Sequence, residues 1–174
     1  MHDPRAPEAA PSAPDALAGV VRGLHHVAIV VPSIAEARRT WEGALGLSVA
    51  ERGGARARGA GSAHPDGADG VEHVADQRVN VLVLFAGSQR VELVEPAGPD
   101  SPVHKFLAKT GGGLHHLAWR VDDVAAALTS LAAAGVRLID AAPRPGAHGT
   151  RIAFVHPKST GGVLMELVED PSHG

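Results

Sequence analysis

Two stretches of the chain share one pattern of apolar and polar positions, ninety residues apart. Residues 24–37 read LHHVAIVVPSIAEA and residues 114–127 read LHHLAWRVDDVAAA. In each stretch a short apolar run predicts a buried strand, and the polar residues after it predict the start of a helix. The tetrad ELVE then follows at residues 92–95 and again at 166–169. This repetition predicts two similar modules that fold side by side.

The first module is predicted as a strand, a helix and further strands. Ser33 and Glu36 have the spacing of a capping box, and Gly46 is placed to end the helix that they begin. Residues 53–70 are rich in Gly, Ala and Arg, so we expect a flexible insertion without a catalytic part. The expected strands are 24–31, 47–52, one that begins near residue 71, and a hairpin of 79–85 and 90–95 that turns at 87–88.

The second module repeats this order after a short linking helix. Ser101 and Pro102 predict the first residues of that helix, and the glycines at 111–113 should stop it. The expected elements that follow are a strand at 114–121, a helix from about 123 to 134 that Gly135 ends, and strands near 136–139, 152–155 and 163–168. Each module is therefore predicted as β-α-β-β-β. One such sheet exposes an apolar face that the other module can cover.

The expected domain organisation follows from these elements. It consists of a disordered leader at 1–22, a first module at 23–97, the linking helix at 98–113, a second module at 114–170 and a tail at 171–174.

Composition restricts the classes of function. The 174 residues carry a net charge of −3, so no basic surplus indicates nucleic acid as a partner. Cysteine is absent, which excludes disulfides, thiolate catalysis and cysteine-ligated zinc. No apolar run approaches the length of a membrane span, and the Pro- and Ala-rich leader lacks the apolar core of a secretion signal. We therefore expect a cytoplasmic enzyme or binding protein without a membrane partner.

Strand geometry selects one histidine from each HH pair. Neighbouring strand residues face opposite sides of a sheet, so both rings of a pair should not reach one site. His26 and His116 share their faces with small or polar residues, which predicts that they point into a cleft. His25 and His115 share theirs with larger apolar residues, so we expect them on the side that packs under the helices, with structural roles.

The two ELVE tetrads offer two pairs of carboxylates. Glu95 and Glu169 stand at predicted strand ends, near solvent. Glu92 and Glu166 lie inside apolar strands, where an unpaired carboxylate is unfavourable and a bound cation would offset that cost. A strand carboxylate taken singly is usually on a solvated face. As a repeated set, however, two imidazoles and two carboxylates predict a site for a divalent metal.

Three longer stretches carry a family resemblance. ELVEPAGPDSPVHKFL, GGGLHHLAWRVDDV and RLIDAAPRPGAHGTRIAFVHPKSTGGVLMELVE resemble the methylmalonyl-CoA epimerases of the vicinal-oxygen-chelate superfamily. The similarity spans residues 24–169 apart from the insertion. It implies an α+β fold in which two tandem βαβββ modules form a half-open, barrel-like sheet around a metal site. It also implies an acyl-CoA substrate, methylmalonyl-CoA, and we expect a homodimer.

The resemblance also implies roles for single residues. It places the metal ligands on His26, Glu92, His116 and Glu166, the set that the repeat also selects. Imidazole and oxygen ligands suit cobalt, manganese, nickel, zinc or magnesium alike. His148 belongs to a loop that lies near the substrate in the family. We also consider Lys158 for binding a phosphate of CoA, although a lysine in a hairpin loop usually faces solvent.

The implied reaction removes and returns the proton between the carboxylate and the thioester of the substrate. Some relatives carry a glutamate at the position aligned with Val81, and valine cannot accept a proton. We therefore expect Glu92, Glu166 or both to act as ligand and proton shuttle, with Glu166 favoured.

Other functions of this superfamily stay open at this point. One is a glyoxalase I-like isomerase that acts on a glutathione adduct through a similar two-histidine, two-glutamate site. Another is a metal-free small-molecule-binding protein of the same fold, although such proteins usually lack the ligand set. A ring-cleaving dioxygenase fits less well because its iron site usually has two His and one Glu and its chains are longer.

Overall fold

A computed structural model of the chain describes residues 20–49 and 69–173. The expected leader and insertion therefore lie almost wholly outside the described residues. The first strand already begins at Val21, within the stretch expected to be leader. The elements are β1 (Val21–Val30), α1 (Ile34–Arg38), η1 (Arg39–Ala44), β2 (Val71–Val74), β3 (Val79–Ala86), β4 (Gln89–Pro96), α2 (Pro102–Thr110), β5 (Gly113–Val121), α3 (Val124–Ala133), β6 (Arg144–Pro145), η2 (Ala147–Gly149), β7 (Arg151–Val155), η3 (Pro157–Ser159), β8 (Leu164–Glu169) and η4 (Pro171–His173).

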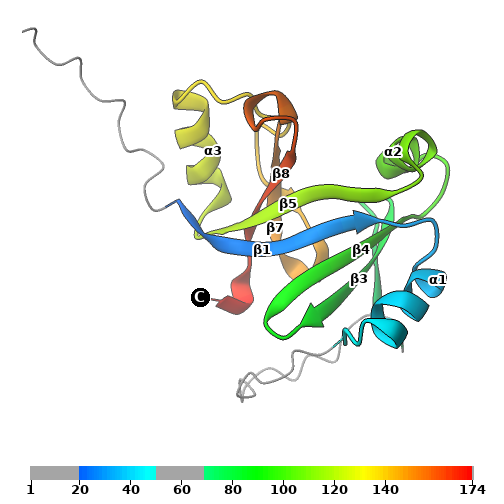
Figure 1. Cartoon of the computed structure of the whole chain (residues 1–174). Helices are drawn as coiled ribbons and strands as arrows, with labels where there is room; N and C mark the ends of the chain where they lie inside the picture. The colour runs from blue at the N-terminus through cyan, green and yellow to red at the C-terminus, as the bar shows by residue number, and fades with distance from the viewer. Residues whose placement is uncertain (1–19, 50–68, 174) are drawn as a thin grey trace, which may run out of the picture.

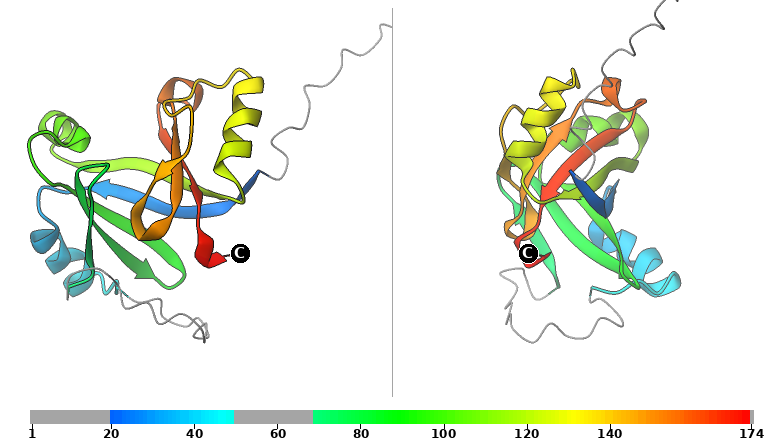
Figure 2. Two further views of the ribbon diagram at one scale, coloured as in Figure 1. Left: turned by 180° about the vertical axis from the view of Figure 1, so that it is seen from behind. Right: turned by 90° about the vertical axis from the view of Figure 1, so that its left-hand side faces the viewer.

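One eight-stranded sheet connects both modules, in the order β2-β3-β4-β1-β5-β8-β7-β6. The two modules meet where β1 pairs with β5 in antiparallel orientation. In each module the first strand pairs with the last in parallel orientation: β1 pairs with β4, and β5 pairs with β8. The sheet curls strongly, and α1 and α3 lie at its opposite ends (Figures 1 and 2). This arrangement confirms the predicted α+β fold with a half-open, barrel-like sheet.

Both faces of the curled sheet are apolar. On the convex face, one cluster packs under α1 around Leu82, Leu84 and Leu93, and another packs under α3 around Val124 and Leu167. Burying a side chain of this size contributes on the order of 1.5–3 kcal/mol.

The concave face carries its own two clusters. One contains Val30, Val81 and Val94 together with Val103 of α2, and the other contains Ile152 and Phe154. The expectation that the cleft face is lined mainly by small and polar residues is therefore wrong. Helix α2 and the curvature of the sheet supply the cover that this face needs.

The two module helices begin in the same way. Ser33 accepts a hydrogen bond from the backbone N–H of Glu36, and Asp123 accepts one from Ala126, as expected for N-caps. A glutamate from the last strand of each module adds a second bond. The Oε2 atom of Glu95 accepts from Ile34 N at 2.7 Å, and the Oε2 atom of Glu169 accepts from Val124 N at 3.1 Å.

The last residue of each ELVE tetrad therefore stabilises the helix start of its own module. Sequence reasoning had placed both carboxylates only near solvent.

Two expected strands are not found as strands among the described residues. Residues 47–49 of the expected strand 47–52 make one isolated bridge, from Ser48 to Phe85, and the rest lies outside the described residues. Residues 136–139 make one bridge, from Leu138 to Val155. The edge strand of the second module is β6 instead, just before the loop that carries His148. An edge strand tolerates Pro145 because a missing N–H is harmless where no further strand pairs.

The other expected elements occur near their predicted positions. The β3–β4 hairpin turns at residues 87–88, and α2 ends at Gly111, whose φ is 75°. The helix expected at 34–45 is helical to residue 44, but its second half has π-helical geometry. Ser101 precedes α2 without making a side-chain cap bond.

Candidate active site

The four predicted metal ligands come from the four central strands of the sheet. His26 lies on β1, Glu92 on β4, His116 on β5 and Glu166 on β8. All four side chains are buried, with 4–8% of each residue exposed. The structure therefore brings together side chains that are up to 140 residues apart in sequence.

Two alanines give these side chains the space they need. Ala28 pairs with Glu92 on one side and with His116 on the other. Ala118 pairs with His26 on one side and with Glu166 on the other. Both alanines are 0% exposed. Because an alanine separates the His from the Glu in each row, the longer side chains can lean over it toward a common centre.

The ligand atoms form a compact group. The Nε2 atoms of His26 and His116 are 3.1 Å apart, and the Oε2 atom of Glu166 lies 3.3 Å from the first and 3.4 Å from the second. One ligand atom from each of these three residues lies within 4.8 Å of the others. The Oε2 atom of Glu92 is 3.5 Å from His26 Nε2 and lies beside this group rather than within it.

Electrostatics favour a cation at this centre. Burial, and after it the negative charge of Glu166, raises the pKa of Glu92 to about 8. Burial also lowers the pKa of His26 well below its usual value, with the positive charge of His116 as the next cause. Burial acts in the same way on His116, but the hydrogen bond and charge of Glu166 outweigh it and raise that pKa.

A divalent ion would relieve the carboxylate repulsion and use the imidazoles in their neutral form. The donor set therefore fits a divalent metal.

Both histidines of each HH pair lie on the cavity side, contrary to expectation. The β1–β5 register shifts between Leu24 and His26, and again where Ala28 pairs with His116 and Ile29 pairs with Leu114. His25 and His115 are thus the extra residues of two β-bulges, and a bulge interrupts the alternation of side chains. The Nδ1 atoms are 2.8 Å apart in the first pair and 2.9 Å apart in the second.

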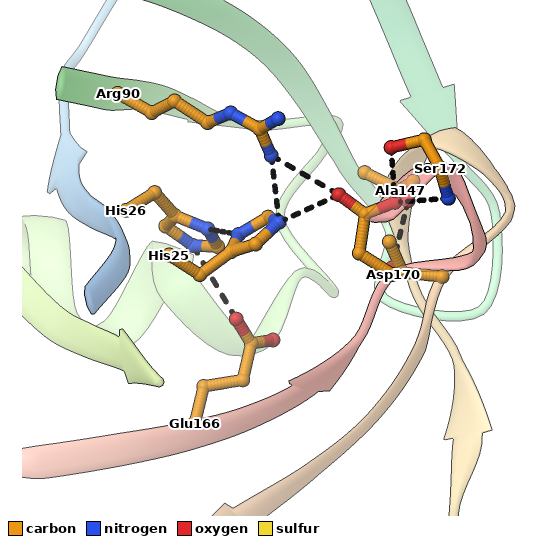
Figure 3. Close-up of polar contacts among 8 residues, drawn as sticks. His25, His26, Arg90, Ala147, Glu166, Asp170 and Ser172 are labelled. Carbon is orange, nitrogen blue, oxygen red and sulfur yellow. Dashed lines mark hydrogen bonds and ion pairs between the residues drawn. The ribbon is translucent and has the colours of Figure 1, made fainter. Parts of the chain in front are cut away.

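A polar network contacts His26 through its Nδ1 atom, on the side of the ring away from the cluster (Figure 3). The Nε2 atom of His25 lies 3.1 Å from Asp170 Oδ2, and Arg90 Nη1 lies 3.2 Å from the same oxygen. The bond to His25 is the largest of the causes that hold the pKa of Asp170 well below its usual range, and Ser172 adds two more bonds. A carboxylate–histidine–histidine chain therefore ends at His26. Such chains orient a metal ligand and fix the position of its proton.

Sequence reasoning missed both Asp170 and Arg90. The available signal was the position of Asp170 directly after the second ELVE tetrad. His115 has a different environment, since its ring stacks edge-on against Phe106 of α2 with centroids 5.0 Å apart. Burial is the main cause that lowers the pKa of His115 to about 4.

A cavity of about 940 Å³ opens from this centre. Its lining includes all four candidate ligands, apolar residues such as Val81 and Phe154, and the cations Arg38, Arg90 and Arg144. This volume and mixture suit an anionic ligand with an apolar part.

The two predicted substrate contacts differ in position. His148 is among the residues that line the cavity, whereas Lys158 lies on η3 between β7 and β8, outside that lining. Val81 lines the cavity and is 3% exposed. Its neighbour Asn80 instead bonds to His73 at 3.0 Å and is absent from the lining. In residues 20–49 and 69–173, no helix is long and apolar enough to cross a membrane.

The chain belongs to the glyoxalase/bleomycin resistance protein/dioxygenase superfamily, whose family model matches residues 25–154. It is 42% identical to the uncharacterised protein YqjC of Bacillus subtilis, over 84% of this chain and 91% of that protein. It is 37% identical to the mitochondrial methylmalonyl-CoA epimerase of Dictyostelium discoideum, over 84% of this chain and 77% of that enzyme.

Similarity extends to solved structures. The crystal structure of methylmalonyl-CoA epimerase from Mycobacterium tuberculosis superposes with a TM-score of 0.72 at 32% sequence identity. The superposition covers 89% of this chain and 93% of that one. The family resemblance expected from the sequence motifs is thereby confirmed.

Proposed function

We propose that this chain is a metal-dependent methylmalonyl-CoA epimerase. The observation that carries the proposal is the buried cluster of His26, Glu92, His116 and Glu166 at the floor of a cavity of about 940 Å³. Its similarity to methylmalonyl-CoA epimerases over most of its length supports this choice of substrate within the superfamily.

The four clustered residues would hold the metal, which is cobalt, manganese, nickel, zinc or magnesium on the chemistry of the donor set. When bound, a divalent cation supplies positive charge that favours the enolate of the substrate over its neutral thioester. His26 and His116 would serve as neutral donors through Nε2. Asp170 and His25 would keep His26 in the orientation that this requires.

Glu166 is the proposed proton shuttle. In the forward step the C–H bond between the carboxylate and the thioester breaks, and its electron pair moves into the enolate. The proton passes to a carboxylate oxygen of Glu166. Delivery of a proton to the opposite face of the planar carbon then gives the other epimer.

Proton–deuterium exchange tests the substrate, the reaction and the metal together. Purified protein is incubated with methylmalonyl-CoA in deuterated water, as isolated, after chelation, and after chelation followed by metal addition. We expect deuterium at the acidic carbon, loss of exchange with chelator and recovery with metal.

A parallel assay uses the hemithioacetal of methylglyoxal and glutathione as an alternative substrate. Turnover of that adduct without exchange into methylmalonyl-CoA would contradict the proposal and favour a glyoxalase I-like isomerase. Absence of both reactions and of stoichiometric metal would favour a binding protein.

A further inference from the structure

We propose that His148, held by Glu72, is a second proton-transfer residue of the active site and serves the substrate face opposite to Glu166. This inference rests on the proposed function. His148 is the catalytic residue for the same reaction, and Glu72 is a positioning residue that acts through His148.

Epimerisation requires proton exchange on both faces of one carbon. The four clustered side chains all rise from the central strands β4, β1, β5 and β8. They therefore approach a substrate from the floor of the cavity. A group for the other face has to come from the opposite wall.

That wall is formed where the two ends of the sheet meet. The strands β2 and β6 lie at opposite ends of the strand order, with the β1–β5 seam in the middle. Because the sheet curls, η2, which follows β6, reaches β2 of the first module. Ala147 of η2 packs against the apolar cluster that contains Val74 and Val81. The contact joins the two ends of the half-barrel beside the cavity, whose lining includes Ala147 and His148.

Two polar interactions within this contact join His148 to Glu72. The Nδ1 atom of His148 lies 2.9 Å from Glu72 Oε2, and the backbone N–H of His148 donates to the same oxygen at 2.8 Å. His148 also lines the cavity. The carboxylate thus fixes both the backbone and the ring, and Nε2 is the atom that would exchange a proton with substrate. A carboxylate on Nδ1 holds the ring in one orientation.

The backbone at His148 supports a specific role for this ring. His148 has φ 55° and ψ 32°, and Gly149 follows with φ 73°. A left-handed conformation at a residue with a Cβ atom is unfavourable by roughly 1–2 kcal/mol. Such residues persist where their surroundings impose the conformation, frequently at functional sites.

The register of β2 and β3 places Glu72 beside Val81, the cavity position at which some relatives carry a glutamate. Glu72 pairs with Val81, and directly paired residues of neighbouring strands share a face. Val81 cannot exchange a proton. The carboxylate of Glu72 stands one strand further out on the same face and presents His148 instead.

The proposed step conserves atoms and charge. From one epimer, Glu166 takes the proton and His148 Nε2–H delivers one to the opposite face of the enolate. From the other epimer the roles are reversed. Each turnover exchanges the protonation states of the two groups, and proton exchange with water restores them.

Separate assays on the two epimers test this assignment. Each pure epimer is incubated in deuterated water with His148→Gln, Glu72→Gln, the parent protein and the control His73→Gln. His73 lies on the same strand as Glu72 and bonds to Asn80 rather than lining the cavity. Deuterium wash-in and inversion are measured together, with metal content and melting temperature for each variant.

We expect His148→Gln to lower inversion by about 10²–10⁴-fold. It should still wash deuterium into one epimer, because Glu166 can remove and return a proton on its own face. Glu72→Gln should show the same epimer-specific pattern with a smaller loss, and it provides the same readout if His148→Gln does not fold. His73→Gln should match the parent.

Two results would overturn the inference. Unchanged inversion in a folded His148→Gln protein would exclude a catalytic role. An equal loss of wash-in from both epimers would show that the Glu72–His148 pair only holds the two ends of the sheet together. If the parent protein itself shows no metal-dependent exchange, the proposed function fails instead, and that result is read before any variant is compared.

Discussion

At the level of single residues, the site depends on side chains whose ordinary behaviour is changed by burial. Glu92 and Glu166 are nearly inaccessible to water, and each lies beside a buried alanine. A buried carboxylate without a partner is unfavourable, so a cation bound beside these two glutamates would stabilise the folded protein. The sequence indicates this need for a cation directly, because each glutamate stands within an apolar run.

The role of Glu166 can be separated from metal binding by Glu166→Gln. An amide oxygen can still coordinate a metal but cannot accept the substrate proton. We expect partial metal retention and a loss of deuterium exchange by about 10²–10⁴-fold. Glu169→Gln is the matched control, since Glu169 lies three residues further along and bonds the start of α3. A metal-loaded Glu166→Gln protein that exchanges at the parent rate would rule out the assignment.

The raised pKa of Glu92 predicts a pH dependence of folding in the metal-free protein. Burial and the charge of Glu166 raise this pKa from 4.5 to about 8, so the folded state binds the proton more tightly than the unfolded chain. The stabilisation from this group is present below pH 4.5 and is lost as pH rises through 8.

Denaturant unfolding of chelated protein measures this effect. We expect the free energy of unfolding of the parent, minus that of Glu92→Gln, to fall between pH 4.5 and 8. The difference isolates Glu92 from the histidines that also titrate there. Two parallel curves would show that Glu92 ionises as readily in the folded protein as in the unfolded chain.

At the level of elements, periodicity and end signals predicted most helices and strands. The repeated strand–helix pattern located β1, α1, β5 and α3 because each strand is an apolar run and each helix begins after a capping residue. Alternation failed at His25 and His115, where an extra residue enters each strand. A β-bulge depends on how a strand is aligned with its partner strand, and the residue pattern of a single strand does not reveal that alignment.

Two adjacent glycines, Gly112 and Gly113, lie where the α2–β5 connection packs against the end of β1, and replacing each of them tests how tight this packing is. Gly112 has φ 108°, and a Cβ atom there would lie 2.7 Å from the carbonyl oxygen of Val30. Gly113 has φ 112°, but a Cβ atom would meet nothing within 4 Å. Both alanine variants incur backbone strain of roughly 1–3 kcal/mol, and only Gly112→Ala adds a steric clash.

We therefore expect Gly112→Ala to lower the free energy of unfolding more than Gly113→Ala. Thermal melting of the two variants beside the parent measures the difference. Equal melting temperatures would mean that β1 and the α2–β5 connection move apart at little cost.

At the level of the whole molecule, the internal repeat was the most informative signal. It predicted two similar modules and placed four ligand-type residues at equivalent points, and the structure brings those residues together. The supporting residues Asp170 and Arg90 and the Glu72–His148 contact were not predictable in this way. Asp170 and Arg90 are brought together by central strands, and the Glu72–His148 contact depends on how the ends of the curled sheet meet. None of them has a counterpart in the repeat.

Because the four proposed ligands come from both modules, we predict that metal binding stabilises the two modules as one unit. His26 and Glu92 come from the first module, and His116 and Glu166 come from the second. An ion that binds only the folded protein, at 100 times its dissociation constant, adds about 2.7 kcal/mol to the free energy of unfolding. For a chain of this size each kcal/mol raises the melting temperature by about 2–4 °C, so we expect an increase of roughly 5–11 °C.

Calorimetric melting of chelated and metal-loaded protein measures this increase, which should appear as a shift of a single transition. The variant His116→Ala removes a ligand from the second module alone and should abolish the shift for the whole chain. His73→Ala, whose side chain does not line the cavity, should preserve it. If metal stabilised only one of two separate transitions, or if His116→Ala kept the full shift, the ion would be held by one module and the centre would not join the two halves of the sheet.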